Sequence, residues 1–180
     1  MVIAVNALIL AAYRELVSAG IERVTAYDAV RDTFRGNFSR TTQLGMRIAM
    51  RLSRDAVGSL SRVSLARVFH GIFGSSYTFH DRIEDDSVEL VITKCAGHDF
   101  FVHEGEPLLT RILCGWDHNW LGPIQSSRHD VKVNRPMTLA TGAGHCEFRI
   151  ARGQGQSALV DTTIQRRSDV TATLGDPVGS

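Results

Sequence analysis

Tyr77-Thr-Phe-His-Asp-Arg82 and Val88-Glu-Leu-Val-Ile-Thr93 mark the point where the chain changes from helical spacing to the pattern of strands. Aromatic and β-branched residues are frequent in both stretches, and Glu84-Asp85-Asp86-Ser87 between them is polar, as turns are. We therefore expect an antiparallel hairpin here. Two further strands are expected over residues 129–141 and 146–152, joined through Gly142-Ala-Gly144.

The chain before this hairpin has helical spacing. Asn6 is expected to cap a helix that runs to Ser18, with Gly20 just beyond its end. Residues 21–55 contain no proline and repeat apolar residues at helical spacing. On this helix we expect a solvated arginine stripe opposite a core face, the latter made of Leu44, Ile48 and Leu52.

A helix is also expected between the two pairs of strands. It covers residues 98–114, with a break near Gly105, and a short helix from Asp117 is expected to end at Gly122-Pro123. The order is thus helices followed by β-β-α-β-β, which predicts an α+β fold with an antiparallel sheet. We expect one domain over residues 1–156, in which residues 1–74 are helical and residues 75–156 form the sheet and contain the cysteines. Residues 157–180 are expected to be a partly disordered C-terminal extension.

The composition excludes several classes of protein. The 180 residues are 43% hydrophobic and 22% charged, and their formal net charge is +1, which argues against disorder and against a strongly basic nucleic-acid binder. The apolar run from Met1 to Ala12 lacks the basic start of a signal peptide, so we expect a core helix and neither a membrane span nor secretion. Three cysteines suit reduced thiols in the cytoplasm. The amphipathic helices could pack internally or across a homodimer.

The chemistry-bearing residues gather in the second half. All three cysteines and five of the seven histidines lie between positions 95 and 146. Three interpretations stay open at this point. The cysteines could be buried packing residues, the cysteines and histidines could bind zinc or iron, or the thiols could serve a hydrolytic site.

The hydrolytic interpretation starts from Cys114 and Asp117, which share one face if their segment is helical. A carboxylate beside a thiol raises the pKa of that thiol, so Asp117 suits proton transfer or orientation better than activation of Cys114. His145 precedes Cys146 directly and is a candidate base, although neighbouring residues of a strand point to opposite faces.

Three blocks of sequence resemble a known family. They are Cys95, then Cys114-Gly-Trp-Asp117, then Asn134-Arg135-Pro-Met-Thr138-Leu-Ala-Thr-Gly142-Ala-Gly-His-Cys146-Glu-Phe148-Arg149. In this order and spacing they resemble the L-2-amino-thiazoline-4-carboxylic acid hydrolase family over residues 90–150. Glu147 stands where the family more often has Asp. The resemblance implies cleavage of a non-peptide C–N bond in a small ring, with no cofactor and no required metal.

The chemistry of such a reaction suggests roles for residues of this chain. Cys114, Asp117, Cys146 and Cys95 would form the catalytic group, with a thiol attacking the ring carbon or holding the attacking water. Arg135 and Arg149 are candidates for the substrate carboxylate, Trp116 for a pocket wall, and His145 for a further substrate contact. Two alternatives remain: a small-molecule-binding or sensory domain without turnover, and a metalloenzyme that uses the cysteines and histidines.

Overall fold

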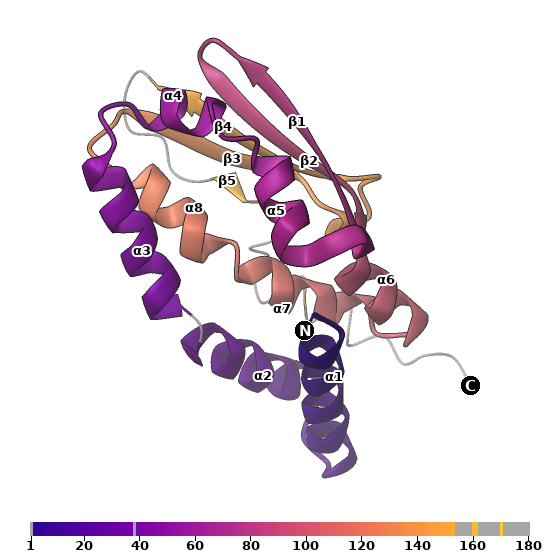
Figure 1. Cartoon of the computed structure of the whole chain (residues 1–180). Coiled ribbons are helices and arrows are strands. Elements are labelled where there is room, and N and C mark those ends of the chain that lie inside the picture. Colours follow the sequence, from indigo (N-terminus) through magenta and orange to yellow (C-terminus); the bar gives the residue numbers. More distant parts are fainter. Residues whose placement is uncertain (1, 38, 154–159, 162–169, 171–180) are drawn as a thin grey trace.

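The computed structural model describes residues 2–37, 39–153, 160–161 and 170, and it confirms the α+β class (Figure 1). The expected hairpin is present as β1 (Tyr77–Glu84) and β2 (Ser87–Cys95), which pair antiparallel around a turn at residues 85–86. The later strands are β3 (Val131–Met137) and β4 (Cys146–Arg152). A short 3-10 turn, η3 (Leu139–Thr141), lies between them.

The order of strands in the sheet is β1-β2-β4-β3-β5. β4 lies between β2 and β3 and runs antiparallel to both, while β5 (Val160–Asp161) adds a short parallel pair beside β3. Because Cys146 pairs with Ile92, the start of β4 lies beside the end of β2. This topology gathers the ends of β2 and β3 and the start of β4 at one end of the sheet.

Helices cover one face of the sheet. These are α3 (Ser39–Leu52), α4 (Ala56–Ser61), α5 (Leu65–Phe73), followed by η1 (Gly74–Ser76), and α8 (His118–Gln125). Their buried side chains join the inward residues of β2, β3 and β4 in one hydrophobic core, which includes Trp120, Leu121, Leu90 and Phe148. Burial of this apolar surface holds the helical layer on the sheet.

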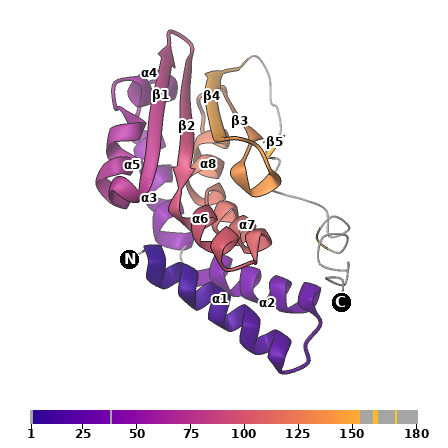
Figure 2. The same ribbon diagram turned by 90° about the vertical axis from the view of Figure 1, so that its right-hand side faces the viewer.

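A second core lies below the end of the sheet. It is formed by α1 (Val2–Ser18), α2 (Arg23–Asn37), α6 (Ala96–His103), η2 (Pro107–Leu109) and α7 (Thr110–Gly115). Figure 2 shows α6 and α7 between the strands and the pair α1 and α2. The expected break at Gly105 is present, since this residue has a φ of 75° and separates α6 from η2.

Two pieces of the expected C-terminal extension contact the domain. β5 pairs with β3, and the Val170 side chain is buried in the second core. The remaining residues of 157–180 lie outside the described residues, and so does the disorder expected for them.

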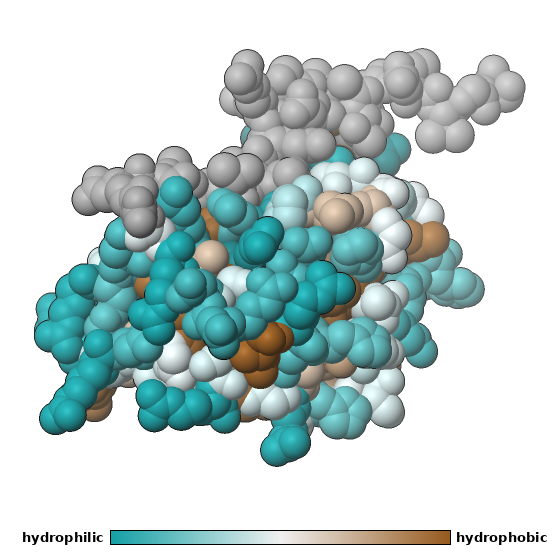
Figure 3. Space-filling view, turned by 90° about the horizontal axis from the view of Figure 1, so that it is seen from above, coloured by the Kyte–Doolittle hydropathy of each residue, from teal (hydrophilic) through white to brown (hydrophobic). Residues whose placement is uncertain are grey.

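The outer face of the sheet is polar. Along β4 the inward residues Cys146, Phe148 and Ile150 alternate with the outward Glu147 and Arg149. Seen from above the view of Figure 1, the molecular surface is mostly hydrophilic with scattered apolar residues (Figure 3). An antiparallel sheet with one covered and one solvated face has this alternation.

Three helical details differ from the sequence prediction. The first helix begins at Val2, so Asn6 lies inside it and does not cap it. On α3 the expected core residues are exposed, and the buried face carries Met50 instead. Pro123 lies inside α8 and does not end it, and its ring is buried.

No helix in the described part of the chain is both long and apolar enough to cross a membrane.

Candidate active site

The three cysteines come from three different elements and meet at the gathered end of the sheet. Cys95 ends β2, Cys114 lies on α7, and Cys146 begins β4. The Cys114 and Cys146 side chains are buried, Cys95 is half-buried, and all three are free thiols. They are far apart in the sequence. They come together because β4 lies beside β2 and α7 packs against η3, the turn between β3 and β4.

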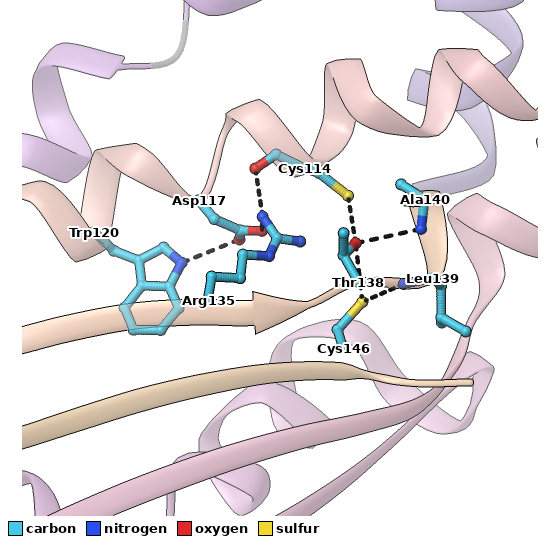
Figure 4. A network of polar contacts seen from close by, with 8 residues as sticks. All are labelled: Cys114, Asp117, Trp120, Arg135, Thr138, Leu139, Ala140 and Cys146. Carbon is cyan, nitrogen blue, oxygen red and sulfur yellow. Dashed lines mark hydrogen bonds and ion pairs between the residues drawn. The ribbon is translucent and has the colours of Figure 1, made fainter. Parts of the chain in front are cut away.

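The hydroxyl of Thr138 connects two of the thiols (Figure 4). The Cys146 thiol donates to Thr138 Oγ1 over 3.5 Å, and the Ala140 N–H donates to the same oxygen over 3.3 Å. These two donors use both lone pairs of the hydroxyl oxygen. Its own hydrogen is therefore left for Cys114 Sγ, which lies 3.9 Å away.

Cys146 is itself fixed by the backbone. Its sulfur accepts a hydrogen bond from the Leu139 N–H over 3.3 Å. The contacts form a directed chain from Leu139 N–H through Cys146 and Thr138 to Cys114. Such a chain ends on Cys114 as the acceptor, and it favours negative charge on that sulfur.

Asp117 is held by two donors. Arg135 Nη1 lies 3.1 Å from Asp117 Oδ2, and Trp120 Nε1 donates to Asp117 Oδ1 over 3.1 Å. Arg135 Nη1 also donates to the Cys114 carbonyl over 3.0 Å, and its guanidinium lies 4.5 Å from the centre of the Phe148 ring. Arg135 is only 1% exposed, so this buried cation joins α7, β3 and β4 at one point.

The pKa of the Cys114 thiol depends on its burial and on the charged groups around it. Burial raises the pKa of the Cys114 thiol to about 12, and Arg135 opposes the shift while Asp117 and the other two cysteines add to it. At neutral pH the resting group is therefore the thiol.

Cys95 lies at the N-terminus of α6. Its sulfur accepts a hydrogen bond from the His98 N–H over 3.4 Å, as an N-cap residue does. Burial raises the pKa of Cys95, while the His98 and Gly97 N–H groups and the Tyr77 hydroxyl oppose the rise. Tyr77 is thus a further polar neighbour of the thiol group.

Five of the eight site residues predicted from the sequence lie together, and the other three have different surroundings. Cys95, Cys114, Asp117, Arg135 and Cys146 come together, as their contacts and mutual electrostatic effects show. Arg149 lies on the outer face of the sheet, 3.3 Å from Glu89 Oε1, and His145 lies 3.8 Å from Glu147 Oε2. Trp116 lines a cavity on the side of α7 that faces α2.

The described part of the chain tests whether the cysteines and histidines could bind a metal. Within residues 2–37, 39–153, 160–161 and 170, no three His, Cys, Asp or Glu side chains are arranged to hold a metal ion. The cysteines face a threonine hydroxyl and backbone N–H groups, which are hydrogen-bonding partners of a thiol and not further metal ligands.

A comparison with protein families identifies the family of this chain. A family model described as L-2-amino-thiazoline-4-carboxylic acid hydrolase matches residues 3–150. The chain belongs to this hydrolase family. The match confirms the resemblance seen in residues 90–150 and extends it through the helical first half. No curated protein matches the chain significantly.

Some neighbours of the candidate site are missing from the candidates drawn from sequence. Thr138 is fully buried between the two thiols, and its only signal in the sequence is its place three residues after Arg135. Asn6 is 0% exposed and its amide has no hydrogen-bond partner among the described residues. Asn6 Nδ2 and the Tyr77 hydroxyl both lie within 4 Å of the position that a Cβ on Gly97 would occupy. A lone Asn on an apolar helix stripe is the signal that could have found it.

Proposed function

We propose that this chain hydrolyses a C–N bond in a small cyclic amidine such as L-2-amino-thiazoline-4-carboxylate, with Cys114 as nucleophile. One observation carries the proposal. Cys114 Sγ receives the remaining hydrogen of the Thr138 hydroxyl, while its own peptide carbonyl is tied to the Arg135 that holds Asp117. The cation and the carboxylate thus lie beside the backbone of the residue that carries the thiol. A positioned thiol with charged groups nearby suits thiol-dependent hydrolysis. The family name supports the same reaction class.

The first step forms the nucleophile. The Cys114 thiol gives its proton to the ring nitrogen of the bound amidine, because that nitrogen is a base and the buried thiol is otherwise neutral. The resulting amidinium is stabilised by the Asp117 carboxylate. The Thr138 hydroxyl stabilises the thiolate that remains.

Bond exchange then follows in two stages. The thiolate attacks C2 and a C–S bond forms. A second proton moves from the exocyclic amino group to the ring nitrogen, the C2–N bond of the ring breaks, and this nitrogen leaves as an amine. Water then adds to the remaining C=N bond of C2, gives one proton to that nitrogen and the other to the Cys114 sulfur, and the Cys114 thiol is expelled. The oxygen stays on C2, so the net reaction is the addition of one water and the product is a carbamoyl-cysteine.

Mass-spectrometric turnover of L-2-amino-thiazoline-4-carboxylate tests the proposal. We expect a carbamoyl-cysteine product from the unsubstituted protein and none from Cys114→Ser. Asp117→Asn should lower kcat by about 100-fold, because the amidinium loses the carboxylate that stabilises it. Asp85→Asn in the exposed hairpin turn is the matched control and should keep full activity.

Two results would contradict the proposal. A folded, unsubstituted protein that forms no product would remove this ring as substrate and favour a binding domain without turnover. Full activity of Cys114→Ser would assign the attack to another group.

A further inference from the structure

A cavity of about 190 Å³ lies beside α7, on the side of the helix that faces α2. Four of its described lining residues are basic, none of them is acidic, and several are aromatic. The basic ones are Arg31, Arg35, Arg111 and His118, and the aromatic ones are Tyr27, Phe34 and Trp116. A concave surface with apolar walls and a few convergent polar groups is typical of a small-molecule site.

The cavity lies beside the helix that carries Cys114. Gly115 and Trp116 line it, and they follow Cys114 directly in the chain. Arg111 Nε donates to the Ala140 carbonyl over 3.3 Å, and Ala140 belongs to the same turn as the Thr138 hydroxyl. Arg111 therefore reaches from the cavity to the turn that holds Cys146 and Thr138.

Electrostatic effects across this boundary agree with the geometry. The pKa of Tyr27 is raised by burial, lowered by Arg31 and Arg111, and raised by Asp28 and Cys114. The ring of Tyr27 is thus close enough to be affected by both the arginines and the thiol.

The basic residues that line the cavity differ in the ion pairs that they form. Arg31 is paired with Asp28 and Asp32 at 2.6 Å and 2.9 Å, so its charge is compensated locally. Arg35 has neither a hydrogen bond nor an ion pair to any other residue in the described part of the chain. Its guanidinium is therefore able to bind an incoming anion, and carboxylates are the small anions that a guanidinium binds bidentately.

We propose that this cavity binds the carboxylate of the substrate through Arg35 and Arg111, with the ring directed along α7 toward Cys114. The link to turnover rests on the proposed function, whereas the binding of a small carboxylate does not. The assignment leaves Arg135 as the positioning residue for Asp117 and Cys114. It also explains why basic and aromatic side chains converge beside a buried thiol.

Kinetics with and without the carboxylate test the assignment. Arg35→Gln should raise KM for L-2-amino-thiazoline-4-carboxylate about tenfold, the usual effect of losing one hydrogen bond to a charged group, with kcat nearly unchanged. For 2-amino-2-thiazoline, which lacks the carboxylate, the same substitution should leave KM unchanged. Arg35→Lys should restore some of the loss. Arg47→Gln, at an exposed arginine of α3, is the matched control and should behave as the unsubstituted protein.

A binding measurement separates this inference from the proposed reaction. Calorimetric titration of Cys114→Ser with L-2-amino-thiazoline-4-carboxylate should show binding, and adding Arg35→Gln should weaken it about tenfold. This result supports the cavity even where the unsubstituted protein forms no product. Equal affinity with and without Arg35, or equal KM for both compounds in Arg35→Gln, would overturn the cavity assignment while leaving the proposed reaction intact.

Discussion

Thr138 has the most constrained side chain of the site. Its hydroxyl is fully buried, it accepts from Cys146 and from the Ala140 N–H, and its hydrogen faces Cys114. A buried hydroxyl with every lone pair and hydrogen assigned has little freedom to turn. It therefore holds the two thiols in a fixed relation, and its loss should affect chemistry more than folding.

Thr138→Val tests this role. Valine has nearly the same shape but no hydroxyl, so the Cys114 thiolate loses its hydrogen-bond donor and kcat should fall about 100-fold. Thr138→Ser keeps the hydroxyl and should retain most of the activity. Both are measured as kcat together with a thermal melt. An active, folded Thr138→Val protein would show that the link between the thiols is unimportant for turnover.

At the level of single residues, the sequence predicts the charged and sulfur-containing groups better than their neutral partners. Cys114 and Asp117 follow from spacing on one helix turn, and Arg135 from the resemblance. The sequence predicts Asn6 as a helix cap, yet it lies inside α1 on the buried stripe with Ile9 and Tyr13. The lone Asn on this apolar stripe marks an unusual position, but the place of its amide depends on how α1, α6 and β1 pack together.

Among the elements, the sequence predicts strands more accurately than helix faces. The hairpin follows from alternation and a polar turn, both of which are local. On α3 the sequence predicts a core stripe at the i, i+4 and i+8 positions Leu44, Ile48 and Leu52, but α8 packs against the other side of the helix. Both sides of α3 carry apolar residues, and only the position of α8 decides which side is buried.

A matched pair on α3 tests which side is buried. Met50→Ala should destabilise the protein by about 3 kcal/mol, because Met50 is 6% exposed within the sheet-facing core. Leu52→Ala should change stability by less than about 0.5 kcal/mol, since Leu52 is 80% exposed. Denaturant unfolding followed by circular dichroism measures both. Equal losses for the two variants would mean that the Leu52 side of α3 is also covered in solution.

At the scale of the whole molecule, the site exists only when both cores are assembled. Cys95 and Cys146 belong to the sheet, whereas Cys114 belongs to α7, whose apolar side packs in the second core. The sequence predicts that these residues matter but not how close they lie, because the strand order β1-β2-β4-β3-β5 is a non-local property. Protection of the thiols should therefore report on global folding.

Thiol labelling measures that protection. Cys114 and Cys146 are 8% and 4% exposed, and burial raises the pKa of Cys114 to about 12, so its thiolate fraction at pH 8 is about one in ten thousand. We expect 5,5′-dithiobis(2-nitrobenzoate) to react rapidly with at most the half-buried Cys95 in the native protein, and with all three thiols in guanidinium chloride. The slow thiols should react faster in Met50→Ala, because weaker global stability populates the unfolded state more often. Rapid reaction of all three thiols in the native protein would contradict a closed site. If the slow labelling rate is the same in Met50→Ala, the site opens locally and independently of the core.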